Sequence, residues 1–88
     1  MKNVYVIGVF DLFHFGHVEL LRRAKELGDR LIVAINGDEM VASYKRRPFL
    51  SEQDRLEVVK ACRYVDDAFI IHGYDNKEYI KKYDIDII

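Results

Sequence analysis

The stretch VYVIGVFDLFHFGH, residues 4–17, decides the fold of this 88-residue chain. Its first half is apolar and largely β-branched, which predicts a parallel strand over residues 2–9 that is covered on both faces. Its second half is a tight turn that brings His14 and His17 to the start of a helix. Residues three apart lie on one side of a helical turn, where free N–H groups and the positive dipole end also point. The stretch therefore predicts an anion site suited to a nucleotide phosphate.

The next residues complete a βαβ unit. Apolar positions recur at helical spacing from His17 to Leu27, opposite a charged face. Gly28 follows, and we expect it to be the C′ cap of this helix. A second buried strand is predicted over residues 31–35, with a right-handed crossover between the two strands.

The alternation of strands and helices continues to the end of the chain. We expect a short helix over residues 39–44, a helix capped by Ser51 with Asp54 at N3, and a strand over 68–71. A last helix over 76–83, capped by Asp75, would precede a fourth strand that begins near Ile85. The pattern predicts an α/β fold with a Rossmann-like open parallel sheet and helices on both faces.

Length and composition limit the class of protein. The length allows one small domain, and a net charge of −1 gives no general attraction for nucleic acid or membranes. No apolar stretch approaches membrane-spanning length, and the N-terminus lacks a signal-peptide layout, so we expect a cytoplasmic protein. The single cysteine excludes an intrachain disulfide and a cysteine metal site.

Two motifs carry a family resemblance. Residues 8–17 resemble the G-[TV]-F-D-x-x-H-x-G-H signature of the cytidylyltransferase branch of the nucleotidyltransferase superfamily. RYVDD at residues 63–67 is similar to the R-Y-V-D-E segment of glycerol-3-phosphate, phosphocholine and phosphoethanolamine cytidylyltransferases. The pattern is most similar to the glycerol-3-phosphate enzymes. It implies one nucleotidyltransferase domain over residues 1–88, and it predicts that the family's C-terminal part, with its nucleotide-closing loop, is missing.

The resemblance implies transfer of CMP from CTP to a phosphorylated alcohol, glycerol 3-phosphate first, with release of pyrophosphate. It also implies Mg²⁺ bound through the nucleotide phosphates, with no direct protein ligand, and a homodimer. Three alternatives stay open: a phosphoethanolamine or phosphocholine acceptor, an adenylyltransferase acting on a sugar phosphate or FMN, and a non-catalytic nucleotide-binding or dimerising module. An acceptor that is already a phosphate oxyanion needs no general base, so catalysis would rest on positioning and electrostatics.

The resemblance also assigns roles to individual residues. The catalytic residues would be His14, His17 and Asp11. The nucleotide would be bound by Gly8, Val9, Phe10, His14, Gly16, His17 and Arg46, with Gly8 and Gly16 leaving room for it. The acceptor would be bound by Lys77 and Arg55, and Arg63 and Asp66 would be structural or lie in a dimer interface.

Simpler interpretations stand beside these roles. The histidine pair could be a solvated helix start or half of a metal site. Arg55 could simply pair with a nearby acid, and Arg63 could form an ion pair with Asp66. Lys45 would assist Arg46 at the phosphates, while Tyr44 replaces a lysine expected on the acceptor phosphate, which leaves the acceptor open.

Overall fold

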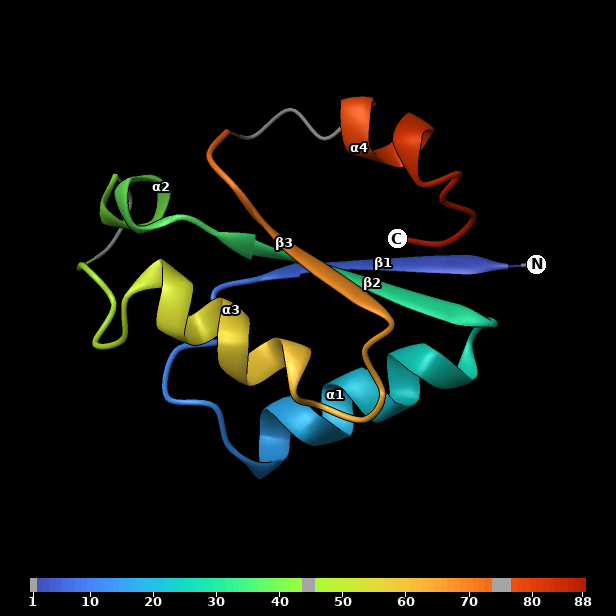
Figure 1. The fold of residues 1–88 in the computed structure, drawn as a ribbon, viewed down its shortest axis with the longest axis horizontal. Helices are drawn as coiled ribbons and strands as arrows, with labels where there is room; N and C mark the ends of the chain where they lie inside the picture. The colour runs from blue at the N-terminus through green and yellow to red at the C-terminus, as the bar shows by residue number, and fades with distance from the viewer. Residues whose placement is uncertain (1, 44–45, 74–76) are drawn as a thin grey trace.

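The computed structural model of the chain describes residues 2–43, 46–73 and 77–88. In chain order its elements are β1 (Asn3–Gly8), α1 (Phe15–Glu26), β2 (Arg30–Asn36), α2 (Asp38–Ala42), α3 (Glu52–Lys60), β3 (Asp67–Ile71) and α4 (Lys77–Lys82). Within the described ranges the strands form one parallel sheet in the order β1-β2-β3 (Figure 1). The predicted open parallel sheet is confirmed.

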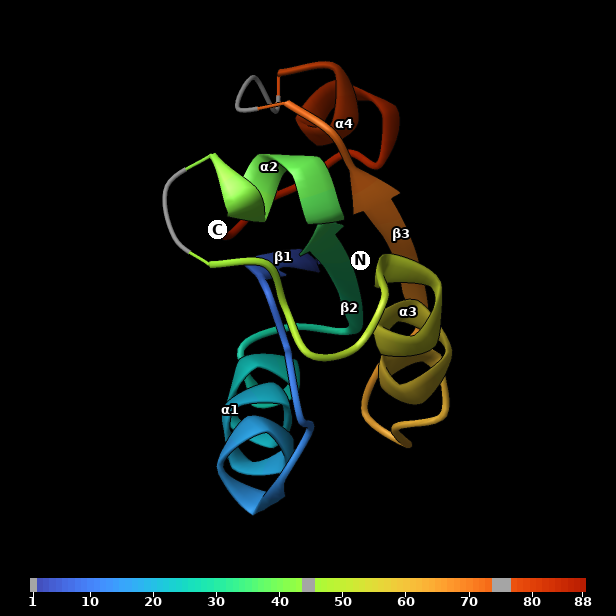
Figure 2. The ribbon, with the colours of Figure 1, turned by 90° about the vertical axis from the view of Figure 1, so that its left-hand side faces the viewer.

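The helices cover both faces of the sheet, as the sequence predicts (Figure 2). Leu21 and Ala24 of α1 and Val59 of α3 are buried in one apolar cluster against the sheet. On the other face, Met40 of α2 lies in a second cluster, against which Tyr79 of α4 also packs. The central strand β2 is buried from Leu31 to Asn36 because both layers cover it.

Helix α1 begins two residues earlier than its periodicity suggests, at Phe15, because His14 is its N-cap. At its other end, Gly28 occupies C′ but does not take the left-handed conformation expected there, and no described glycine has a positive φ. Glycine is required at this position because there is no space for a side chain. A β-carbon on Gly28 would lie 2.7 Å from the carbonyl oxygen of Lys2 and 2.8 Å from Val4 Cγ2.

Two expected helices agree with the structure in part. The short helix expected over 39–44 is α2, at Asp38–Ala42, and the last helix is α4. Tyr44, Lys45, Asp75 and Asn76 lie outside the described residues, so the expectations about them are not addressed. None of the helices in the described ranges is long and apolar enough to cross a membrane.

The expected fourth strand is represented by a single parallel bridge between Val4 and Ile87. Tyr5 N donates to Ile87 O at 2.8 Å, and Ile87 N donates to Asn3 O at 3.2 Å. The segment therefore lies on the side of β1 away from β2. Strands β2 and β3 are each added on the same side of the sheet, whereas the next segment, at Ile87, is added on the other side of β1. Helix α4 lies on the opposite face from α1 and α3, as one constant hand of crossover requires.

Candidate functional site

The turn that leaves β1 is strained. Phe10 has φ 54° and Leu12 has φ 50°, a left-handed conformation that costs an L-residue about 1–2 kcal/mol. The Phe10 ring is buried over Gly8, and the Asp11 carboxylate accepts the backbone N–H groups of Phe49 at 2.7 Å and Leu50 at 3.0 Å. These contacts hold the turn in its conformation. Strain fixed in this way is a feature that clusters at functional sites.

Both histidines take part in a capping box at the start of α1. His14 Nδ1 accepts the N–H of Gly16 at 3.0 Å, and His17 Nδ1 accepts the N–H of His14 at 3.1 Å. A nitrogen that accepts a hydrogen bond carries no proton, so each neutral imidazole has its proton on Nε2. The cap therefore selects the tautomer in which both histidines offer an Nε2–H donor beside the helix N-terminus.

The surroundings of His17 favour its neutral form. Burial, and secondly the nearby charge of His14, lower the pKa of His17 below its ordinary value. The Phe13 ring stacks on the His17 ring at 5.3 Å, the Phe10 ring meets it edge-on at 5.5 Å, and the two imidazoles are 4.1 Å apart. The lowered pKa therefore favours His17 as an uncharged donor.

The two glycines of the motif make room for side chains of the protein itself. A β-carbon on Gly8 would lie 2.7 Å from the Phe10 ring, and one on Gly16 would lie 2.7 Å from His14 Cε1. The expectation that these glycines also leave space for a nucleotide stays a prediction. Gly8 lets the Phe10 ring close over the end of β1, and Gly16 lets the His14 imidazole fold back onto the helix start.

Two clefts flank the turn at the carboxyl end of β1. One, of about 360 Å³, is lined by Ile7, Gly8, Val9, Phe10, Asp11, His17 and Leu20. The other, of about 120 Å³, is lined by Val9, Asp11, Val41, Arg46, Arg47 and Pro48. In open parallel sheets, ligands bind outside the carboxyl ends of strands at the point where the strand order reverses. That point is β1 in this fold.

Arg46 reaches the smaller cleft from an exposed loop. Its guanidinium carbon lies 4.3 Å from the centre of the Phe49 ring, whereas Arg47 pairs with Glu39 at 2.8 Å. The sequence analysis identified Arg46 but missed Phe49. An aromatic residue directly after Arg46-Arg47-Pro48 is the signal that could have pointed to it.

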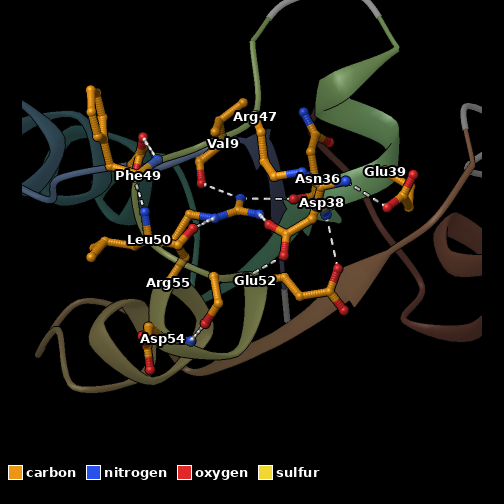
Figure 3. A network of polar contacts seen from close by, with 12 residues as sticks. Val9, Asn36, Asp38, Glu39, Arg47, Phe49, Leu50, Glu52, Asp54 and Arg55 are labelled. Carbon is orange, nitrogen blue, oxygen red and sulfur yellow. Dashed lines mark hydrogen bonds and ion pairs between the residues drawn. The ribbon is translucent and has the colours of Figure 1, made fainter.

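Arg55 is at the centre of a polar network rather than at a surface (Figure 3). Its side chain is fully buried and donates to the carbonyl oxygens of Leu50 (3.1 Å), Val9 (2.9 Å) and Asn36 (2.7 Å) and to Asp38 Oδ1 (2.7 Å). The expectation that Arg55 binds the acceptor is corrected by this burial. The alternative, that it pairs with an acid, is confirmed, and its effect is to tie together the ends of β1 and β2.

Asp38 and Glu52 complete this network, and the sequence analysis assigned neither of them a role in the site. Asp38 N donates to Glu52 Oε1 at 2.8 Å, and Glu52 N donates to Asp38 Oδ2 at 3.2 Å (Figure 3). Each carboxylate thus caps the first turn of the other's helix. Ser51 caps α3 as predicted, because its hydroxyl oxygen accepts the N–H of Asp54 at 3.2 Å.

Comparisons with known proteins decide the family. Residues 5–88 match the family model described as Cytidylyltransferase-like. The chain belongs to this family. It is 46% identical to an FAD synthase of Thermococcus kodakarensis over 98% of the chain and 59% of the relative, and 43% identical to an ethanolamine-phosphate cytidylyltransferase of Arabidopsis thaliana over 99% and 21%. A glycerol-3-phosphate cytidylyltransferase of Staphylococcus aureus is 40% identical over 99% and 67%.

A solved structure agrees with the fold. A lipopolysaccharide core biosynthesis protein from Thermoplasma volcanium superposes with a TM-score of 0.90 at 31% identity, over 98% of this chain and 70% of that one. The chain thus spans between about a fifth and two thirds of the length of these relatives.

The remaining predicted site residues of this cytidylyltransferase-like chain are Lys77, Asp66 and Arg63. Lys77 is exposed at the first residue of α4, on the sheet face opposite α1. Asp66 pairs with Lys25 and accepts the N–H of Leu31 at 2.7 Å, and these contacts lower its pKa although burial opposes them. An ion pair of Asp66 with Arg63 within the described chain is not observed, and the expected place of these two residues in a dimer interface stays a prediction. Among the described residues Arg63 has no ion pair, and it lines a separate cleft of about 370 Å³ with residues of α1 and α3.

Proposed function

We propose that this chain binds CTP and transfers CMP to a phosphorylated alcohol, with glycerol 3-phosphate as the first candidate. The observation that carries the proposal is the histidine capping box, which leaves Nε2 as the donor nitrogen of both imidazoles at the start of α1, with His17 also lining the cleft at the end of β1. Imidazole N–H donors and a helix N-terminus form a ready anion site. Membership of the cytidylyltransferase-like family supports the same chemistry.

The reaction follows from charges and positions. An oxygen of the acceptor phosphate forms a bond to the α-phosphorus of CTP, and the bond from that phosphorus to the bridging oxygen breaks, so pyrophosphate leaves with the electron pair. The acceptor oxygen is already ionised near neutral pH, and no proton has to be removed. His14 and His17 stabilise charge on the phosphate oxygens, and Arg46 offsets the repulsion between the two anions. Val9 and Phe10 border the nucleotide.

Magnesium fits this arrangement through the nucleotide. The described residues contain no group of three or more histidine, cysteine or acidic side chains that could hold a metal ion. Asp11 is engaged by the backbone N–H groups of Phe49 and Leu50, which lower its pKa together with Arg55 although burial opposes them. We therefore propose that Mg²⁺ is held mainly by phosphate oxygens and water, where it would share the charge of the triphosphate.

An adenylyltransferase acting on FMN is the second candidate. FAD synthases of Thermococcus kodakarensis and Pyrococcus abyssi are 46% and 49% identical to this chain, against 40% for the glycerol-3-phosphate enzyme of Staphylococcus aureus.

We also propose a homodimer through the cleft that Arg63 lines. A non-catalytic module would bind nucleotide without releasing pyrophosphate.

Pyrophosphate release tests the proposal. CTP and ATP are each tried with Mg²⁺ against glycerol 3-phosphate, phosphoethanolamine, phosphocholine, a sugar phosphate and FMN. We expect turnover with CTP and glycerol 3-phosphate, whereas turnover only with ATP and FMN would support the second candidate. Binding of CTP with no turnover across the panel would support a non-catalytic module.

Substitution of the histidines tests the mechanism. His14→Ala and His17→Ala should each slow turnover about 100- to 1000-fold, as expected for loss of a transition-state donor. His72→Ala is the matched control, because His72 is an exposed histidine just after β3 and outside the capping box. Rates close to wild type in both motif variants would contradict the mechanism.

A further inference from the structure

We infer that Phe49 is a positioning residue, whose ring holds the Arg46 guanidinium at the smaller cleft beside the turn so that it meets the phosphates of the nucleotide. The inference rests on the proposed function, because it assigns a task at the same anion site. Phe49 would touch no reacting atom and would act through Arg46.

The ring of Phe49 is exposed and does not belong to either apolar core cluster. Its exposed fraction is 62%, which is high for a side chain of this size. Its one described ring contact is with the Arg46 guanidinium carbon, 4.3 Å from the ring centre, within the range of a cation–π contact. The contact with the Arg46 guanidinium therefore explains why the Phe49 ring is exposed.

The backbone of Phe49 is fixed to the turn that presents the histidines. The N–H groups of Phe49 and Leu50 both donate to Asp11, which lies between the two left-handed residues Phe10 and Leu12. The position of the ring is thus set relative to the turn, and Arg46 is set relative to the ring. These contacts link the Arg46 cation to the turn that carries the histidines.

The two neighbouring arginines are used differently. Arg47 is neutralised by Glu39 at 2.8 Å, whereas within the described ranges no carboxylate lies within ion-pair distance of Arg46. The ring orients Arg46 without cancelling its charge. A cation held in this way loses less side-chain freedom when an anion binds, because part of its ordering has already taken place.

A double-mutant cycle tests the inference. Phe49→Leu should raise the KM for CTP about two- to fivefold, the range that corresponds to an exposed cation–π contact, with kcat changed less than twofold. In an Arg46→Gln background the same substitution should have no further effect. With Arg47→Gln, the matched control, the effects of the two changes should multiply. Phe49→Trp should restore the wild-type KM.

Two readouts separate this inference from the proposed function. The Arg46 Hδ protons should resonate upfield in the NMR spectrum of the wild type, under the ring current of Phe49, and return toward ordinary values in Phe49→Leu. Calorimetric titration with pyrophosphate should show the same cycle without turnover. Pyrophosphate binding with the expected coupling but no turnover would defeat the proposed function and leave the inference standing.

Three results would overturn the inference. One is an equal effect of Phe49→Leu in the wild-type and Arg46→Gln backgrounds, which would mean that the ring acts directly on the ligand. Another is an unshifted Arg46 Hδ signal in the wild type. The third is the absence of pyrophosphate binding by the wild type, which would remove the anion site itself.

Discussion

Replacing Arg55 with methionine keeps an unbranched side chain but removes the hydrogen bonds that the guanidinium donates to three carbonyl oxygens and to Asp38. Removing one partner of a buried ion pair costs about 3–5 kcal/mol, because the other partner stays buried and unpaired. Asp38 keeps 21% of its side chain exposed, so water can partly solvate it and we expect about 3 kcal/mol. A chain of this length has roughly 4–13 kcal/mol of stability in total. The variant should fold, with a large loss of stability.

Urea unfolding followed by far-UV circular dichroism measures this loss. With a typical slope for a small domain, the midpoint should fall by about 1–3 M. Arg63→Met, an exposed arginine without an ion pair among the described residues, should stay within about 0.5 kcal/mol of wild type. Arg55→Lys keeps the charge but reaches fewer acceptors, so an intermediate loss is expected, which keeps the test valid if the methionine variant fails to fold.

The reasoning is refuted if Arg55→Met unfolds within about 1 kcal/mol of wild type. If, in addition, the KM for the acceptor rises tenfold in that variant, Arg55 binds the acceptor, as the sequence resemblance first implied. A loss of stability shared by Arg55→Met and Asp38→Asn would instead place the arginine in the framework of the site.

Further expectations concern the turn and its cap. Leu12→Gly should be about 0.5–1 kcal/mol more stable than Leu12→Ala in urea unfolding, because it relieves a φ of 50° at an exposed position; equal stabilities would contradict the strain. Gly16→Ala should displace the His14 imidazole and weaken CTP binding about five- to tenfold, which corresponds to the loss of one hydrogen bond. Calorimetry measures this affinity, and an unchanged value would contradict the role of the glycine. The pKa of His17 is lowered on folding, so the unfolded chain binds more protons and the free energy of unfolding should fall as the pH drops below about 6.5. His17→Gln should reduce the dependence of the urea midpoint on pH between about pH 8 and 5. A wild-type midpoint that does not change with pH would contradict the neutral cap.

The layout of the fold could be predicted from sequence because its signals are local. The apolar run at residues 31–35 and the helical spacing after His17 each depend on neighbours in the chain. Both signals gave elements close to the observed β2 and α1. The start of α1 differed because periodicity locates apolar faces and not caps, and His14 is an unusual capping residue.

The roles of individual polar residues depended on contacts that the sequence does not show. Arg55 draws its acceptors from the end of β1, the end of β2, the first residue of α2 and the loop before α3, a combination that only the assembled fold produces. The glycines illustrate a related limit. Gly8 and Gly16 were expected to make room for a nucleotide, whereas the groups seen next to them are the rings of Phe10 and His14.

The strained turn and the reversal of strand order occur at the same place, the carboxyl end of β1. Because the segment at Ile87 returns beside β1, the carboxyl end of β1 is the place where chain segments diverge and a ligand can approach the backbone. The two left-handed residues together cost about 2–4 kcal/mol, a substantial share of the stability of a small domain. A turn without them would be more stable, but it would not hold Asp11 between the histidine cap and the loop of Arg46 and Phe49. We interpret the strain as the cost of joining three groups of the proposed anion site; because glycine adopts the left-handed φ of residue 12 without that cost, the Leu12→Gly variant should gain stability and keep its affinity for CTP.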